Sequence, residues 1–130
     1  TIATIPDGTS NVVGFSERLA TCNTRDGVTI AGGGNLLWWP GGNWWWSAHD
    51  WGPTIANGGN RGQGNNWNQP PMVSVSDPNK CDRSRVSSAH NIAQVLMMDG
   101  SLRGVGSSVT QATWIAAITA NDGVPLGSDW

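Results

Sequence analysis

The C-terminal third of the chain decides the fold: residues 88–130 read SAHNIAQVLMMDGSLRGVGSSVTQATWIAAITANDGVPLGSDW. The apolar run that ends at Met98 predicts a largely buried strand. Asp99-Gly100 predicts a two-residue hairpin turn, because this dipeptide readily adopts the backbone angles that such turns need. Residues 101–106 would return as the partner strand. This region therefore predicts an antiparallel β-hairpin.

A short helix is predicted directly after the hairpin, over residues 110–119. Trp114, Ile115 and Ile118 recur at helical spacing, so that one face can pack on the sheet. Ser108 or Thr110 can cap the first turn. Because a helix of about ten residues is marginal in isolation, we expect it to depend on that packing.

Upstream segments add further strands. Asp7-Gly8 marks a turn, and a strand of roughly six residues is predicted from Val12 onward. Asp26-Gly27 marks a second turn before a strand over residues 28–30, and residues 72–76 alternate as a short strand does. The chain is therefore predicted to be one α+β domain spanning residues 1–130, mainly antiparallel β-sheet with a short C-terminal helix.

Residues 32–71 differ in composition from the rest, because Gly, Asn and Trp dominate them. Their Gly and Pro residues exclude a long helix, and their Trp residues argue against a flexible linker, so we predict an ordered loop insertion. Seven of the nine Trp lie here: Trp38, Trp39, Trp44, Trp45, Trp46, Trp51 and Trp67. Three interpretations remain open for them: a subunit interface, a platform that stacks on sugar rings, and an intramolecular core.

Composition limits the classes of partner. Charged residues make up 12% of the chain, about half the usual share, and the net charge is −2. The basic residues cluster only at Lys80, Arg83 and Arg85, a smaller patch than nucleic-acid binders show. Few charges also leave little repulsion between copies. We therefore expect no nucleic acid as partner, and a homo-oligomer or polymer is favoured.

The sequence also indicates an exported protein. Cys22 and Cys81 could pair, and that bridge would close a long loop and stabilise the fold by ~4 kcal/mol. Two buried free thiols are the alternative. The 130 residues contain no apolar run of ~18 residues, so no membrane span is predicted, and no signal peptide. The start at Thr1, without Met, is expected of a mature product or a piece of a longer protein.

Several motifs together resemble a known family. They are Ile5–Asn11 (IPDGTSN), Glu17, Cys81-Asp82, Ser88-Ala89-His90, Asp99–Arg103 (DGSLR), Ala112-Thr113-Trp114 and Leu126–Trp130 (LGSDW). In this order they resemble the C-terminal part of the prepilin-like proteins abundant in planctomycetes, which are similar to type IV pilins and type II secretion pseudopilins. The family's defining motif is a His, nine residues and then Asp-Gly.

The chain departs from that family in two respects. Eight residues, one fewer than in the motif, separate His90 from Asp99 and Gly100. The family's N-terminal cleavage motif and apolar helix do not occur in these 130 residues. We therefore expect that this chain alone would not anchor in a membrane or form the helical core of a pilus. That helix would be removed by processing, left disordered or supplied by a separate chain.

The resemblance implies a structural role. The expected function is that of a non-enzymatic subunit of an extracellular or periplasmic filament, tube or surface appendage. The alternative is a secreted carbohydrate-binding module that uses the Trp cluster to bind polysaccharide. A catalytic triad of Ser88, His90 and Asp99 is disfavoured, because a strand and a turn would separate its members. Residues 88–130 are then a family marker, while residues 32–71 would determine what this member does.

The C-terminal loop raises the question of a metal. Pseudopilins of the major type often hold calcium in such a loop, so the resemblance implies Asp122 and Asp129 as candidate ligands. Carboxylate oxygens suit Ca²⁺. The loop lacks the regular EF-hand pattern, and a solvated turn is the favoured interpretation. No other cofactor is expected.

Overall fold

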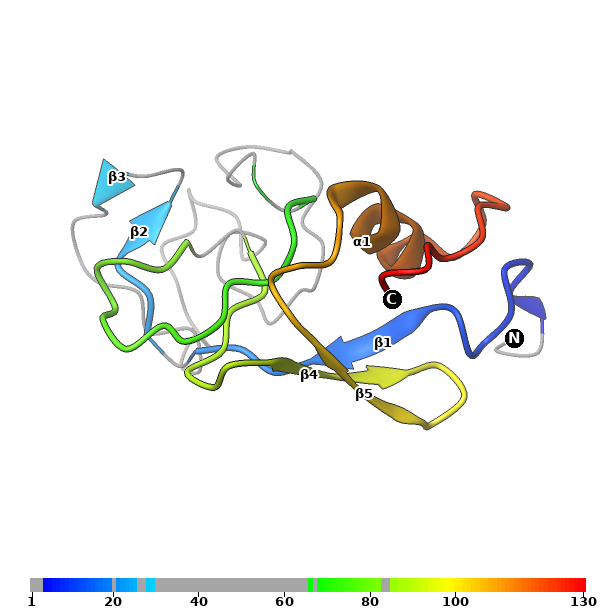
Figure 1. Cartoon of the computed structure of the whole chain (residues 1–130), viewed down its shortest axis with the longest axis horizontal. Coiled ribbons are helices and arrows are strands. Elements are labelled where there is room, and N and C mark those ends of the chain that lie inside the picture. Colours follow the sequence, from blue (N-terminus) through cyan, green and yellow to red (C-terminus); the bar gives the residue numbers. More distant parts are fainter. Residues whose placement is uncertain (1–3, 20, 26–27, 30–65, 67, 83–84) are drawn as a thin grey trace, which may run out of the picture.

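A three-stranded antiparallel sheet and one helix form the centre of the structure (Figure 1). The computed structural model describes residues 4–19, 21–25, 28–29, 66, 68–82 and 85–130. The described elements are β1 (Val13–Ser16), β2 (Thr24–Arg25), β3 (Val28–Thr29), β4 (Ala93–Met97), β5 (Leu102–Val105) and α1 (Gln111–Ile118). The sheet order is β1-β4-β5, and β2 pairs with β3 in a separate two-stranded ladder. The small α+β fold that the sequence predicts is thus present.

The hairpin of β4 and β5 forms where it was predicted, but its turn differs. Gly100 N donates to Met97 O at 3.0 Å, and Met97 N donates to Ser101 O at 2.8 Å. Gly100 has a φ of +88°, whereas Asp99 does not have a positive φ. This is a three-residue loop that ends on a left-handed glycine, so the predicted two-residue turn is wrong. Asp99 Oδ1 accepts from both the N–H and the hydroxyl of Ser101, which favours this geometry.

Strand β1 is shorter than predicted and its register shifts. Val13 pairs with Met97 and Phe15 pairs with Leu96, so β1 has one more residue than β4 over this interval. Side chains alternate between the two faces of a strand, and an extra residue reverses that alternation. The shift therefore places Val13 on the buried face and Phe15 on the opposite, exposed face.

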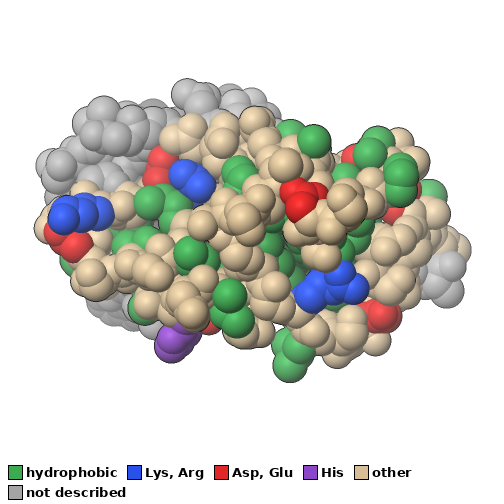
Figure 2. Space-filling model, in the orientation of Figure 1, with side chains coloured by type: hydrophobic (Ala, Val, Ile, Leu, Met, Phe, Trp, Pro, Cys, Tyr) green, Lys and Arg blue, Asp and Glu red, His purple; other side chains and the backbone are tan. Residues whose placement is uncertain are grey.

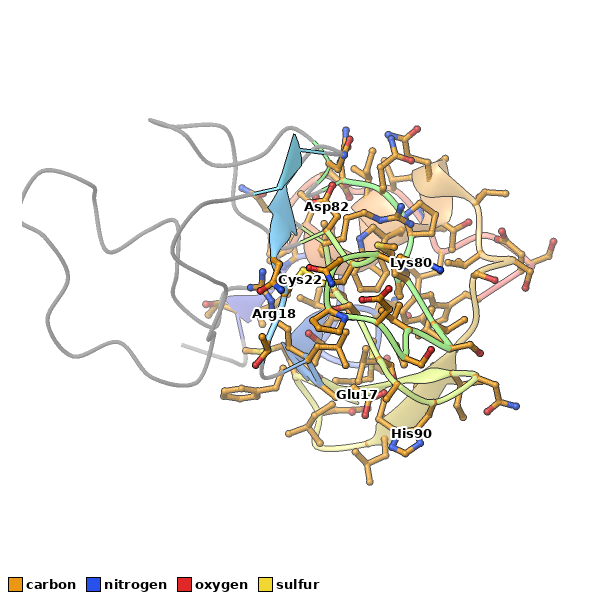
Figure 3. All side chains as sticks on the ribbon, turned by 90° about the vertical axis from the view of Figure 1, so that its left-hand side faces the viewer. Glu17, Arg18, Cys22, Lys80, Asp82 and His90 are labelled. Atoms are coloured by element: carbon orange, nitrogen blue, oxygen red, sulfur yellow. A yellow bond between two sulfur atoms is a disulfide. The ribbon has the colours of Figure 1, made fainter. Side chains whose placement is uncertain are left out.

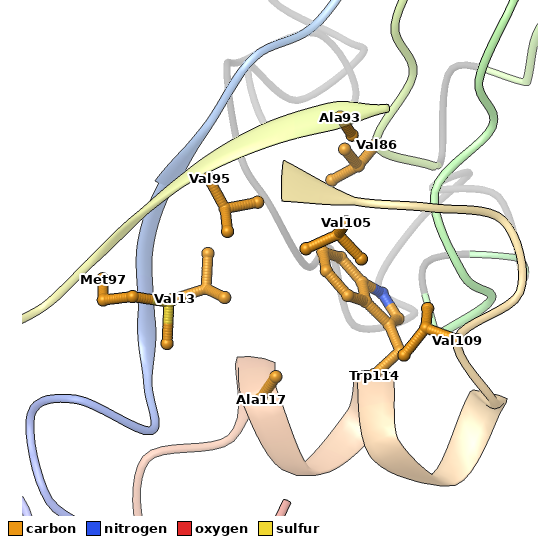
Figure 4. Packing of buried hydrophobic residues seen from close by; sticks show 9 residues of the cluster. All are labelled: Val13, Val86, Ala93, Val95, Met97, Val105, Val109, Trp114 and Ala117. Atoms are coloured by element: carbon orange, nitrogen blue, oxygen red, sulfur yellow. The ribbon is translucent and has the colours of Figure 1, made fainter. Parts of the chain in front are cut away.

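The core lies between one face of the sheet and α1 (Figure 4). Along β4, Ala93, Val95 and Met97 are buried, whereas Gln94 is exposed. Helix α1 places the fully buried Trp114 against this face, and Thr110 caps its first turn by accepting from Thr113 N. The predicted helix, its cap and its packing on the sheet are confirmed.

A second cluster surrounds a disulfide. Cys22 and Cys81 are bonded, their Cα atoms are 5.7 Å apart, and both residues are buried beside Val75. Leu19 and Met72 pack against them. The disulfide interpretation of the two cysteines is therefore confirmed, and the free-thiol alternative is wrong.

The other predicted strands have mixed outcomes. The strand that begins at residue 28 is confirmed as β3, which pairs with β2. Residues 72–76 are not a strand, because Ser74 has a φ of +57° and Met72 forms only an isolated bridge with Ser87. The insertion over 32–71 lies outside the described residues except for 66 and 68–71, and so do the seven Trp from Trp38 to Trp67. No helix among the described residues is long and apolar enough to cross a membrane.

The disulfide predicts a large dependence of stability on oxidation. It joins residues 59 positions apart, and a loop of that length lowers the entropy of the unfolded chain enough to add about 4 kcal/mol to the free energy of unfolding. We expect the Cys22→Ala/Cys81→Ala double variant to lose roughly this amount in urea titrations. A wild-type sample kept reduced should match it, and equal midpoints for the oxidised and reduced protein would contradict the prediction.

Candidate functional site

His90 and Asp99 lie at opposite ends of β4. The five residues of this strand, which lie between them, span roughly 13 Å at about 3.3 Å per residue. The imidazole of His90 is exposed at the periphery (Figure 3), while its backbone N–H donates to Ser88 Oγ at 3.0 Å and its carbonyl accepts from Ser74 N at 2.6 Å. Ser88 is buried. The structure therefore does not bring Ser88, His90 and Asp99 together as a triad.

The N-terminal motif around Asp7 contacts the C-terminal loop and the hairpin turn between β4 and β5. Asp7 Oδ2 accepts from Asp122 N at 3.0 Å, and Asp7 Oδ1 accepts from Gly123 N at 2.9 Å. In the same loop, Thr9 O accepts from Asp99 N at 3.1 Å. Segments from the start, middle and end of the chain therefore meet beside the hairpin turn.

Asp129 fastens the C-terminal segment to the start of α1. Its Oδ2 accepts from Thr110 N at 2.6 Å, and its Oδ1 accepts from the hydroxyl of Thr113 at 2.6 Å. The Thr113 hydroxyl, and then the Thr110 N–H, lower the pKa of Asp129 because they stabilise the ionised carboxylate. The position at a helix N-terminus also favours a negative charge.

Two more contacts involve residues of the resemblance. The Arg103 guanidinium lies over the ring of Trp130, 5.6 Å from the ring centroid, which is within range for a cation–π interaction. Glu17 N donates to Gln94 O at 2.9 Å, and Gln94 N donates to Glu17 Oε1 at 3.0 Å. The Glu17 carboxylate thus extends the pairing of β1 with β4 beyond the last strand residue.

The candidate calcium ligands take part in these contacts. Asp129 holds the start of α1, and Asp122 Oδ1 accepts from Val124 N at 2.9 Å. Among the described residues, no group of three or more His, Cys, Asp or Glu side chains is placed to hold a metal ion. Calcium binding at Asp122 and Asp129 stays a prediction, and both carboxylates accept hydrogen bonds from the backbone of the loop or the helix.

A buried charged cluster beside the disulfide was missed by sequence reasoning (Figure 3). Asp82 is only 7% exposed and accepts from Asn66 Nδ2 at 2.7 Å. Burial lowers the pKa of Arg18 and Arg85, and the negative charge of Asp82 partly opposes this shift for both. The guanidinium of Arg85 also donates to Pro70 O, at 3.0 Å from Nε.

This cluster corrects the interpretation of Arg85 as part of a basic patch. The Asp82 carboxylate balances positive charge beneath the surface, where an uncompensated charge is costly. Asp82 directly follows the half-cystine Cys81, and both residues are buried. Through Asn66 and Pro70, the cluster connects this part of the described chain to the disulfide region.

No protein-family model, no curated protein and no solved structure matches the chain. The prepilin-like resemblance therefore stays a prediction that rests on the motifs quoted above. The structure shows what those motif residues do in this fold: Asp7, Glu17, Asp99 and Asp129 each accept hydrogen bonds that fix the backbone of another segment or turn.

A substitution at Gly100 of the hairpin turn distinguishes the cost of backbone strain from the cost of a side-chain clash. Gly100 has a φ of +88°, and no atom lies within 4 Å of the position that a Cβ would occupy, so Gly100→Ala should destabilise by about 1 kcal/mol through strain alone. Gly106→Ala is the matched control, because Gly106 does not have a positive φ. We expect it to be neutral or to stabilise by roughly 0.5 kcal/mol in thermal unfolding. Equal losses in the two variants would contradict the assigned geometry.

Asp129 predicts an acid-sensitive contribution to stability. Its pKa is lower in the folded state than the ordinary value of 3.8, so its contribution is complete above that value and is lost as the pH falls through the folded pKa. We expect Asp129→Asn to lower the melting temperature at pH 6 and to converge with wild type at strongly acidic pH.

Thr113→Val tests the cause of this dependence, because it removes the hydroxyl that contributes most to the shift. In the Thr113→Val background, the Asp129→Asn substitution should cost less at pH 6 than it does in wild type. Melting curves from pH 2 to pH 7 provide the measurement. A difference between wild type and Asp129→Asn that stays constant over this range would show that the carboxylate charge is not involved.

Proposed function

We propose that this chain is a structural subunit of a pilin- or pseudopilin-like assembly outside the cytoplasm, where many copies form a filament, tube or surface appendage. The observation that carries the proposal is the role of the matched motif residues. They join distant parts of the chain: the loop at Asp7 binds residues 122 and 123, the same loop binds the hairpin turn at Asp99, and Asp129 binds the start of α1.

These contacts suit a subunit that must keep its shape. The hydrogen bonds of Asp7 span 115 and 116 residues, and the disulfide spans 59. Carboxylate-to-backbone hydrogen bonds are stronger than neutral ones, and each of these links closes a long loop. Because the N-terminal loop binds the hairpin turn and the C-terminal segment binds the start of α1, the domain resists being pulled apart at either end. A polymer under mechanical tension needs this property from its subunits.

The proposed location outside the cytoplasm is supported by the Cys22–Cys81 disulfide. Disulfides persist in oxidising compartments and are rare in the cytosol. The scarcity of charge, at 12% of residues, also supports association of identical copies.

Electron microscopy tests the proposal directly. Native cell-surface material labelled with an antibody against this chain should show regular filaments or tubes that carry the label. Material that stays a dispersed monomer under all conditions, with label absent from any regular structure, would overturn the proposal. Asp7→Asn should weaken the fastening of the C-terminal loop and reduce the amount of assembled material, whereas Asp77→Asn, outside that contact, is the control.

A secreted carbohydrate-binding module is the second candidate, and the composition of residues 32–71 favours it. Trp rings stack on sugar faces, and the many Asn residues can hydrogen-bond to hydroxyl groups. Affinity electrophoresis in polysaccharide gels would show retardation that Trp38→Ala or Trp45→Ala removes. Val124→Ala, at an exposed apolar residue outside this segment, is the control. Retention of assembly in both Trp variants together with loss of retardation would favour the module.

A further inference from the structure

The face of the sheet opposite α1 is apolar, although no helix among the described residues covers it. Phe15 of β1, Leu96 of β4 and Leu102 of β5 are register partners, so they form one row across all three strands. Phe15 is 70% exposed and Leu102 is 75% exposed. A sheet with one face in water normally carries polar side chains on that face, so this row departs from the expected pattern.

Two glycines extend the apolar surface on either side of the row. A Cβ at Gly14 would meet Met98 Sδ at 2.8 Å, and a Cβ at Gly104 would meet Ile92 Cδ1 at 2.8 Å. The Met98 and Ile92 side chains therefore lie against the glycine backbone, where any larger residue would displace them. They fill the space beside the row and produce a low, continuous surface. We call Phe15, Leu96, Leu102, Met98 and Ile92 the outer apolar face.

The outer apolar face carries no charged residue of β1, β4 or β5, and the carboxylate of Glu17, the residue after β1, lies at its edge and accepts from Gln94 N. Gln94, which precedes Leu96 by two positions and has Gly104 as its register partner, is the polar side chain on the strands there. Figure 2 shows hydrophobic side chains that reach the surface along the lower side of the molecule, where Figure 1 draws the sheet. A partner with a charged surface would find no oppositely charged group on this face of β1, β4 or β5. A second identical face would meet it without like-charge repulsion.

We propose that the outer apolar face is a two-fold interface between copies of this chain. The row has Leu96 at its centre, with Phe15 at one end and Leu102 at the other. A two-fold axis parallel to β4 and passing by Leu96 stacks the two sheets face to face, about 10 Å apart. It places Leu96 opposite Leu96, and the Phe15 of each copy opposite the Leu102 of the other. This arrangement is the reciprocal pairing that a closed two-fold contact requires.

This inference rests on the proposed function in that it names one contact between subunits, yet it can fail separately. In a face-to-face pair, the outer apolar face of each copy is fully occupied by the other copy, so this contact cannot add a third copy. Growth into a polymer would then need at least one other surface. The interface is therefore a pairing contact within the assembly, and it makes the dimer the unit that polymerises.

Sedimentation equilibrium of the full chain tests the pairing. Wild type should show a concentration-dependent equilibrium between monomer and dimer. The Phe15→Thr/Leu102→Thr double variant should raise the dissociation constant at least ~100-fold, because each side chain is buried twice in a two-fold contact. Thr retains strand propensity and both sites are exposed, so the variant should fold. Val124→Thr, at an apolar residue 52% exposed outside the sheet, is the matched control and should leave the constant unchanged.

Photo-cross-linking tests the geometry. With benzoylphenylalanine in place of Phe15, irradiation of the dimer should yield a cross-linked peptide pair that joins position 15 of one copy to the β5 segment around Leu102 of the other. Melting curves of every variant provide the check on folding. A cross-link to any other region would overturn the two-fold arrangement even if the protein dimerises.

The remaining outcomes are also decisive. Wild type that stays monomeric at millimolar concentration overturns the inference, and so does a double variant that dimerises as wild type does. Filaments that form normally from the double variant would sink the inference and leave the proposed function standing. If wild type dimerises, the double variant does not, and neither protein forms filaments, the inference stands and the proposed function fails. Cross-linking of position 15 to a different protein in cell-surface material would assign the face to that other partner.

Discussion

The burial of Trp114 in the core beneath the sheet is the contact on which the rest of the structure depends. A helix of eight residues is too short to be stable alone, so α1 depends on its buried face, which shares one core cluster with Ala93, Val95 and Met97. That packing decides which face of the sheet is the inner one. It also fixes the position of the helix N-terminus, where the Asp129 carboxylate binds and holds the C-terminal segment.

Around this small core, polar contacts provide much of the long-range organisation. The carboxylates of Asp7, Glu17 and Asp129 each accept from backbone N–H groups of another segment. The disulfide and the buried Asp82 cluster perform a similar task at the other end of the molecule. Several of the few charged residues in this chain lie where two segments meet. A charge-assisted hydrogen bond there stabilises the fold more than an exposed ion pair would.

This organisation connects the motif residues with the proposed assembly. The residues of the resemblance make the domain rigid, and the register shift in β1 turns Phe15 outward beside Leu96 and Leu102. The sheet thus has one apolar face that packs on its own helix and a second, exposed one that the proposed pairing would cover. A domain that buried both faces internally would need another layer of structure over β5 and β1.

The amino-acid sequence by itself determined the local elements. Periodicity predicts the helix at Trp114 and the strand that ends near Met98, and Asp99-Gly100 predicts a turn between that strand and the next, since these preferences depend on neighbouring residues. Tertiary structure alone decided the turn type, the irregular path of residues 72–76, and the partners of Asp129 and Asp82. The tertiary structure also decided the register shift that exposes Phe15. A shift of one residue costs little free energy locally, so the packing of the whole sheet on α1 selects it.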